Sequence, residues 1–176
     1  MRATRWRRQR GLTLLEFTLI TMIISALVAF ALQRISSVSV YMERAAIDYS
    51  VARMRESLAL EFAEMVVEGR LGQLPGGEDL NPLAREVVVE NYAGARALPA
   101  ASRREPGQWY YDPAIESVVY VPRYPQALRW PEGEPRVLRW RAVARWHDAD
   151  GDGEFDRGSD RVTSLELVRR DEAQWR

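Results

Sequence analysis

The sequence predicts an α+β fold, in which one long N-terminal helix packs on a small antiparallel β-sheet. Three observations predict it. The run 12–32 is apolar and long enough for a helix that crosses a bilayer. Apolar residues then recur at helical spacing as far as Met65, and from Gln108 onward the pattern alternates as in β-strands. The length of 176 residues suits one domain and an anchor.

The segment 1–11 is strongly basic. It contains five arginines and no acidic residue: Arg2, Arg5, Arg7, Arg8 and Arg10. The positive-inside rule keeps such a segment in the cytoplasm and sends the chain after Leu32 across the membrane. Without this segment the chain is acidic, which argues against nucleic acid as the main partner. The chain has no cysteine, so no disulfide can brace the exported part.

The apolar run contains one charge, Glu16, close to its start. An ionised residue inside a bilayer is unfavourable, by about 2.5 to 3.5 kcal/mol at the bilayer centre and by less near the end of a helix. Such a residue is a functional candidate, because some other group has to compensate for its charge. We therefore expect Glu16 to be a site residue.

The stretch Arg10-Gly11-Leu12-Thr13-Leu14-Leu15-Glu16 resembles the prepilin signal of type IV pilins and type II secretion pseudopilins, whose usual form is Gly-Phe-Thr-Leu-Ile-Glu. The resemblance implies a pilin-like fold and a leader, 1–11, which a prepilin peptidase removes between Gly11 and Leu12. Leu12, in place of the usual Phe, would become the N-methylated first residue. Glu16 would pair with the free amine of a neighbouring subunit during filament assembly. The recognisable similarity covers about the first quarter of the chain.

Two other interpretations remain open for the same segment. A secretory signal peptide also has a basic head and an apolar core, and Ala29-Phe30-Ala31 offers a cleavage site after Ala31. The length of the apolar run and the early Glu16 argue against it. An uncleaved single-pass anchor is the second alternative.

The helix is expected to continue beyond the apolar run, as far as about Glu68. Its first half, 12–34, would lie in the membrane or in a filament core, and its second half, 35–69, would be amphipathic. The amphipathic stripe has spacings of three and four residues: Ile47, Val51, Met54, Leu58, Phe62 and Met65. Residues 36–40 (Ser-Ser-Val-Ser-Val) are only moderate helix formers, so two separate helices are the alternative. Gly69, Gly72 and the run 75–77 end the helix.

The segment 70–107 is rich in Gly, Pro and charge, with one short apolar run at Val87–Val89, and we expect a largely irregular connection with one short strand or helical turn. The segment 108–176 carries the sheet. Strands are expected at 115–121 and 136–146, and a hairpin partner for the latter at 162–168. Leu138, Trp140, Ala142, Ala144 and Trp146 would face inward, with Leu165 and Leu167 opposite. Glu166 would pair with a cross-strand arginine.

An acidic loop separates the last two predicted strands. Asp148, Asp150 and Asp152 alternate with small residues, and Gly153 follows, as at the start of a calcium loop of EF-hand type. The candidate ligands are Asp148, Asp150, Asp152, Glu154 (through its carbonyl), Asp156 and Asp160, and Phe155 occupies the place of an apolar anchor. Ser159 stands where such loops carry a bidentate Glu, and the flanks are strands rather than helices. We expect a structural calcium ion, with a solvated Asp/Gly turn as the alternative.

No catalytic constellation is recognised. Cysteine is absent, and the single histidine, His147, continues the polar face of a predicted strand. We expect a filament subunit that is not an enzyme. The resemblance favours a minor pilin of a type IV pilus, for example of the mannose-sensitive haemagglutinin type, ahead of a type II secretion pseudopilin. Its partners would be the prepilin peptidase, other pilin subunits and the inner membrane, with the C-terminal domain in the periplasm and then on the filament. A membrane-anchored calcium-binding module that does not polymerise is the third alternative.

Overall fold

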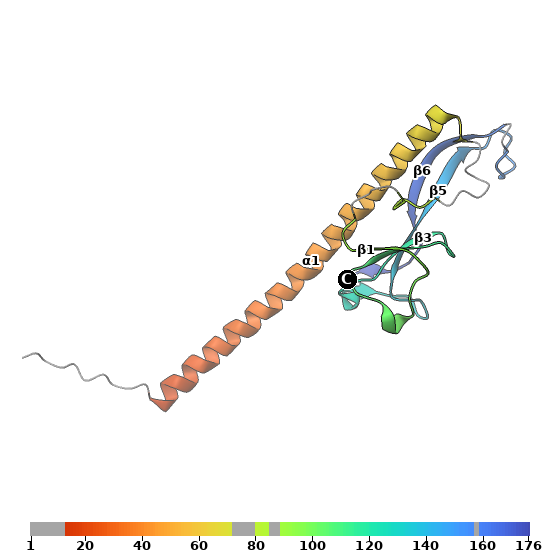
Figure 1. Ribbon diagram of the computed structural model, residues 1–176. Helices are drawn as coiled ribbons and strands as arrows, with labels where there is room; N and C mark the ends of the chain where they lie inside the picture. The colour runs from red at the N-terminus through yellow and green to blue at the C-terminus, as the bar shows by residue number, and fades with distance from the viewer. Residues whose placement is uncertain (1–12, 72–79, 85–88, 157–158) are drawn as a thin grey trace, which may run out of the picture. The chain divides into compact units, whose positions relative to one another are not determined.

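The computed structural model describes residues 13–71, 80–84, 89–156 and 159–176 (Figure 1). The leader 1–11 and the predicted cleavage site at Gly11 and Leu12 lie outside the described residues. So does 85–88, which contains the first two residues of the apolar run Val87–Val89. The chain divides into two compact units between Met42 and Glu43. Both contain part of a single helix, α1 (Leu14–Glu68), so the prediction of one continuous helix is confirmed over these residues.

The first unit contains the apolar part of α1. Residues Leu14–Leu32 are long and apolar enough to cross a membrane, and a signal sequence would have the same character. Their side chains are exposed on every face of the helix. A helix that is apolar all round needs an apolar environment, either lipid or other helices.

The second unit begins at Glu43, and there α1 becomes amphipathic. The predicted stripe is confirmed: Ile47, Val51, Met54, Leu58 and Met65 are buried in the main core, and Phe62 packs against it while partly exposed. The helix ends at a glycine. Gly69 has φ +70°, its N–H donates to the carbonyl of Val66 (3.3 Å), and the N–H of Arg70 donates to the carbonyl of Met65 (3.0 Å). This pair of bonds is the Schellman motif, which requires a left-handed residue at this position.

A five-stranded sheet has the strand order β1-β2-β3-β5-β6. The strands are β1 (Tyr92–Ala95), β2 (Trp109–Asp112), β3 (Ser117–Tyr120), β5 (Leu138–His147) and β6 (Arg161–Arg169). Strands β2, β3, β5 and β6 pair antiparallel, but β1 pairs with β2 in parallel. The sheet is therefore mixed, and the prediction of a wholly antiparallel sheet was wrong in this respect. The parallel pair arises because a connection with the 3-10 helix η2 (Ala101–Arg103) joins β1 to β2, instead of a tight hairpin turn.

Two very short strands make a separate antiparallel pair, β4 (Leu128–Arg129) with β7 (Gln174–Trp175), and the 3-10 helix η3 (Pro125–Ala127) precedes β4. Figure 1 shows the C-terminal part of α1 running along the sheet that contains β5 and β6. Between them lies the main core, where Trp109 contacts Tyr120 and Trp140 with ring centroids 4.7 and 5.4 Å apart. A smaller cluster of Tyr110, Val119, Val121 and Val137 is also buried.

The hairpin predicted at the end of the chain is confirmed. Strand β5 pairs with β6, and Leu138, Trp140 and Ala142 of β5 are buried as expected. The cross-strand pair also forms, with Arg145 Nε donating to Glu166 Oε2 at 2.9 Å. The regular register breaks between Arg145 and Trp146, and Trp146 is 38% exposed instead of buried. Pairing resumes with Trp146 opposite Val162 and His147 opposite Arg161, so Thr163 is an extra residue in β6 at this point. A β-bulge of this kind bends the strand and changes the direction of the side chains next to it.

Glu43 is a buried carboxylate on the inner face of α1, only 6% exposed. Its Oε1 accepts hydrogen bonds from the Tyr120 hydroxyl (2.9 Å) and the Arg123 N–H (2.6 Å), and its Oε2 accepts one from the Tyr124 N–H (3.2 Å). A buried carboxylate is tolerated only when it is bonded in this way. Glu43 therefore joins the helix to β3 and to the segment that follows it.

Burial raises the pKa of Tyr120, and the carboxylate of Glu43 raises it further. The protonated hydroxyl, which donates to Glu43, is thus the stable form. Because the pKa in the folded state is above that in the unfolded chain, this contribution to stability is intact below about pH 10 and falls as the pH rises above that value.

We predict that Glu43→Ala lowers the free energy of unfolding by about 3 kcal/mol, because two backbone N–H groups and the Tyr120 hydroxyl lose their acceptor. Asp48→Ala, on an exposed position of the same helix, should change it by no more than about 0.5 kcal/mol. The measurement is urea unfolding of the full chain in detergent micelles, followed by tryptophan fluorescence. Equal effects of the two substitutions would contradict the role assigned to Glu43.

Candidate functional site

The first candidate site is the start of α1. Thr13 precedes the helix, and its Oγ1 accepts a hydrogen bond from the Glu16 N–H at 3.3 Å. In return, Glu16 Oε2 accepts from the Thr13 N–H (2.9 Å) and the Thr13 hydroxyl (3.0 Å). These reciprocal bonds form a capping box, which satisfies donors that a helix N-terminus leaves free. The carboxylate of Glu16 thus has partners within its own chain, which reduces the cost of placing it beside an apolar helix.

The second candidate site is the acidic loop between β5 and β6, which is built around Asp148. The two oxygens of Asp148 accept hydrogen bonds from the N–H groups of Gly151 (2.6 Å) and Gly153 (2.9 Å). Both glycines have positive φ, +78° and +81°, a conformation that other residues adopt only with strain. The alternation of Asp and Gly in the sequence therefore produces a tight loop that wraps around one carboxylate.

The loop brings three of the predicted ligands together. One carboxylate oxygen from each of Asp148, Asp150 and Asp152 lies within 4.8 Å of the others. Calcium binds oxygen at about 2.3 to 2.6 Å, so oxygens at this separation can contact a single ion. Oxygen is also the ligand type that calcium prefers. The three side chains therefore fit a calcium ion by their chemistry and their spacing, and solvent can supply further oxygens because the loop is exposed.

The remaining predicted ligands are placed differently. The carboxylate of Asp160 accepts hydrogen bonds from the Ala149 N–H (3.0 Å) and the Asp156 N–H (2.9 Å), so it joins the two ends of the loop. Among the residues that the structure describes, the group of converging carboxylates does not include Asp156 or Asp160. Glu154 was expected to contribute its backbone carbonyl, and that expectation stays a prediction. The carboxylate of Asp160 thus bonds to backbone N–H groups of the loop.

The charges of the loop repel one another. Repulsion from Asp152 is the largest cause that raises the pKa of Asp156, and Asp150, Asp160 and Glu154 add to it. The hydrogen bonds from Gly153 and Gly151, in that order, lower the pKa of Asp148. Since the pKa of Asp156 is raised by folding, its ionisation opposes the folded loop, and this destabilisation grows as the pH rises through the raised value. A bound cation would offset the repulsion at neutral pH.

Phe155 anchors the loop to the rest of the protein. Its side chain packs against the main core while partly exposed, and its ring meets Trp146 edge-on, with centroids 5.9 Å apart and planes at 75°. Phe155 therefore packs into the domain, as expected for the apolar anchor of such a loop. Through Trp146, Phe155 holds the acidic loop against the end of β5.

Sequence reasoning missed Thr13, and it named Asp160 as a candidate ligand but not as the residue that closes the loop. The role of Thr13 was detectable, because Thr13-x-x-Glu16 has the spacing of a capping box. The role of Asp160 was not, because it depends on how the loop closes. Comparisons of the chain with family models, with curated proteins and with solved structures found no match.

We predict that calcium raises the melting temperature of the full chain in detergent micelles at neutral pH, by about 5 °C at a saturating concentration. Asp150→Asn and Asp152→Asn should each reduce this shift, whereas Glu132→Gln, on an exposed acid outside the loop, should leave it unchanged. The shift should also shrink near pH 4, where the carboxylates begin to take up protons. A melting curve that excess chelator does not change would show that the loop is a solvated turn.

Proposed function

We propose that this chain is a minor pilin-like subunit of a type IV pilus-type filament. In this proposal a prepilin peptidase cleaves between Gly11 and Leu12, and Leu12 becomes the methylated first residue. The apolar part of α1 holds the subunit in the inner membrane before assembly and lies in the filament core afterwards. The domain from Glu43 onward is then periplasmic and later exposed on the filament.

The observation that carries the proposal is the change in character along a single helix. Residues Leu14–Leu32 of α1 are apolar on every face, whereas from Glu43 onward the same helix buries one stripe in the core of a mixed sheet. A helix of this kind gives a subunit both an apolar segment for membrane or filament and a stripe that belongs to the core of a folded domain. The stretch from Gly11 to Glu16 adds the resemblance to a prepilin signal.

Glu16 is the residue for which filament assembly offers a specific role. In the free chain its carboxylate accepts hydrogen bonds from Thr13. Cleavage before Leu12 would create a new amine one residue before Thr13, and a positive charge of this kind on a neighbouring subunit can form a charge-assisted hydrogen bond with the same carboxylate. We propose that Glu16 exchanges its partners within the chain for this amine when subunits assemble. The exchange removes an unpaired charge from the apolar core.

In the same proposal, the acidic loop is a structural element. It closes the β5–β6 hairpin, and the chain has no disulfide that could do so. We propose that a bound calcium ion holds this hairpin rigid in the oxidising, calcium-containing space outside the membrane. A pseudopilin of a type II secretion system would use the same parts, and the filament in which the subunit is found distinguishes the two.

We predict that Glu16→Gln leaves cleavage and membrane insertion intact but lowers the amount of the subunit in sheared filaments by about tenfold or more, because the neighbour's amine loses its ionic partner. Thr21→Val is the matched control, since the Thr21 hydroxyl bonds only within its helix, to the Phe17 carbonyl at 2.8 Å. The measurement is immunodetection of the subunit in the filament and membrane fractions. Normal incorporation of the Glu16→Gln subunit would contradict the role assigned to Glu16, whereas absence of the unsubstituted chain from the filament fraction would support a membrane-anchored calcium-binding module that does not polymerise.

A further inference from the structure

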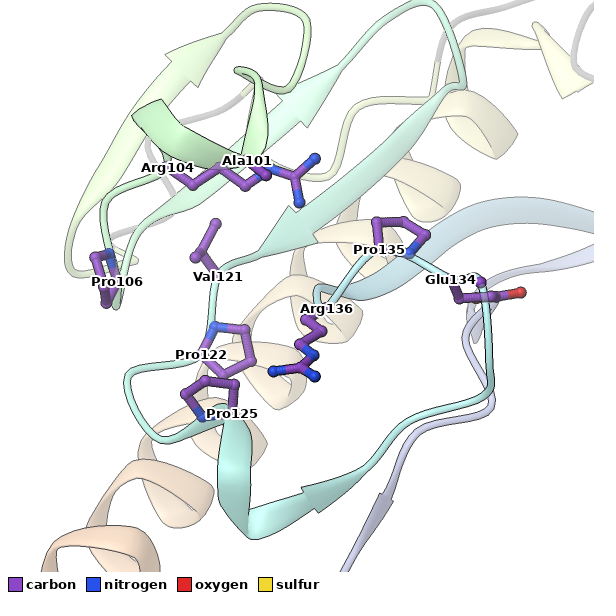
Figure 2. A pocket seen from close by; sticks show the side chains of 10 residues that line it. Ala101, Arg104, Pro106, Val121, Pro122, Pro125, Glu134, Pro135 and Arg136 are labelled. Atoms are coloured by element: carbon purple, nitrogen blue, oxygen red, sulfur yellow. The ribbon is translucent and has the colours of Figure 1, made fainter.

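A pocket of about 630 Å³ lies on the second unit, away from the acidic loop (Figure 2). This volume is within the range of ligand pockets, about 300 to 1,000 Å³. Three segments supply its walls: the start of η2 with the residues that follow this helix, the segment after β3, and the loop before β5. Four proline rings and the side chain of Val121 form the apolar part of the lining, from Pro106, Pro122, Pro125 and Pro135.

Backbone hydrogen bonds fix these walls in the absence of any ligand. The Gly107 N–H donates to the Val121 carbonyl (2.6 Å), the Val121 N–H donates to the Gln108 carbonyl (3.0 Å), and the Val137 N–H donates to the Pro135 carbonyl (2.8 Å). Val121 itself belongs to the smaller buried cluster, so this part of the lining is packed against the interior of the domain. Because proline has a fixed φ, little conformational freedom is left to lose when a ligand binds.

Two guanidinium groups give the pocket a positive charge. Arg104 is half-buried and held by one hydrogen bond, from its Nε to the Pro99 carbonyl at 2.9 Å, so its terminal nitrogens keep donors for a ligand. Arg136 is exposed and forms no ion pair with the part of the chain that the structure describes. In Figure 2, Val121 lies between the two arginines.

The one acid of the lining does not neutralise this charge. Glu134 forms an ion pair with Arg139, which is not part of the pocket, at 2.9 Å between Oε2 and Nη2. Figure 2 shows the carboxylate of Glu134 directed away from Arg136 and from the proline rings. The charge that a ligand would meet is therefore that of Arg104 and Arg136.

We propose that this pocket binds an acidic peptide segment of a partner protein. Side-chain carboxylates of the peptide would pair with Arg104 and Arg136, and an apolar side chain between them would cover Val121 and the proline rings. A small inorganic anion would leave the apolar lining uncovered. Nucleic acid would need an extended basic surface, which a chain with an excess of acidic residues after residue 11 does not provide. The proposal does not depend on assembly into filaments.

The test is binding of a fluorescein-labelled, C-terminally amidated peptide with a Glu-Leu-Glu core to the full chain in a nonionic detergent, measured by fluorescence anisotropy. We expect binding that weakens with added salt, and a Kd about tenfold higher for a Gln-Leu-Gln peptide. Arg136→Glu should raise the Kd for the acidic peptide about tenfold or more. Arg103→Glu is the matched control, because Arg103 is exposed at the end of η2 and does not line the pocket, so its Kd should stay within about twofold.

Three outcomes would overturn the proposal. The first is equal affinity for the Glu and Gln peptides, and the second is an equal change in Kd for Arg136→Glu and Arg103→Glu. The third is binding only of a Gln-Leu-Gln peptide that has a free terminal carboxylate. The melting temperature of each variant shows whether it is folded. If Arg136→Glu were unfolded, Arg136→Gln would replace it, with the same expected direction. Loss of filament incorporation by the Glu16 variant would leave these results unchanged, so the two proposals fail separately.

Discussion

The buried carboxylate of Glu43 is the interaction on which the second unit depends. It stands at the start of the amphipathic part of α1 and accepts hydrogen bonds from Tyr120, Arg123 and Tyr124, which lie 77 to 81 residues further along the chain. Apolar contacts along the stripe from Ile47 to Met65 give the helix its affinity for the sheet, but such contacts are not directional. The bonds to Glu43 are directional, so they fix where along the helix the end of β3 is held.

This position of β3 determines where the other functional features lie. Strand β3 is central in the sheet, between β2 and β5, and the segment that follows it provides Pro122 and Pro125 to the arginine-lined pocket. Strand β5 pairs with β3 at one end and leads into the acidic loop at the other, where Phe155 and Trp146 join the loop to the core. Loss of the Glu43 hydrogen bonds would therefore change the position of the pocket residues directly. It would change the position of the acidic loop only through β5.

The sequence was sufficient for the features that depend on local patterns. Helical spacing from Ile47 to Met65 predicted the buried face of α1, and alternation from Leu138 to Ala144 predicted β5. The grouping of Asp148, Asp150 and Asp152 also follows from their spacing in one loop. Other features depend on distant residues. The parallel pairing of Tyr92 with Trp109 and the pocket between Arg104 and Arg136 give no periodic signal. Glu43 lies one helical turn before Ile47, so its burial was predictable, but its partners were not.

The proposed filament role of Glu16 depends on where the mature chain begins. The most direct test is to express the full chain with and without a prepilin peptidase, and to determine its intact mass and N-terminal sequence. We expect a chain that begins at a methylated Leu12 only when the peptidase is present. Glu16 is then the fifth residue of the mature chain. A chain that begins at Leu32, as after cleavage by a signal peptidase, or one that keeps Met1 in the presence of an active peptidase, would contradict it.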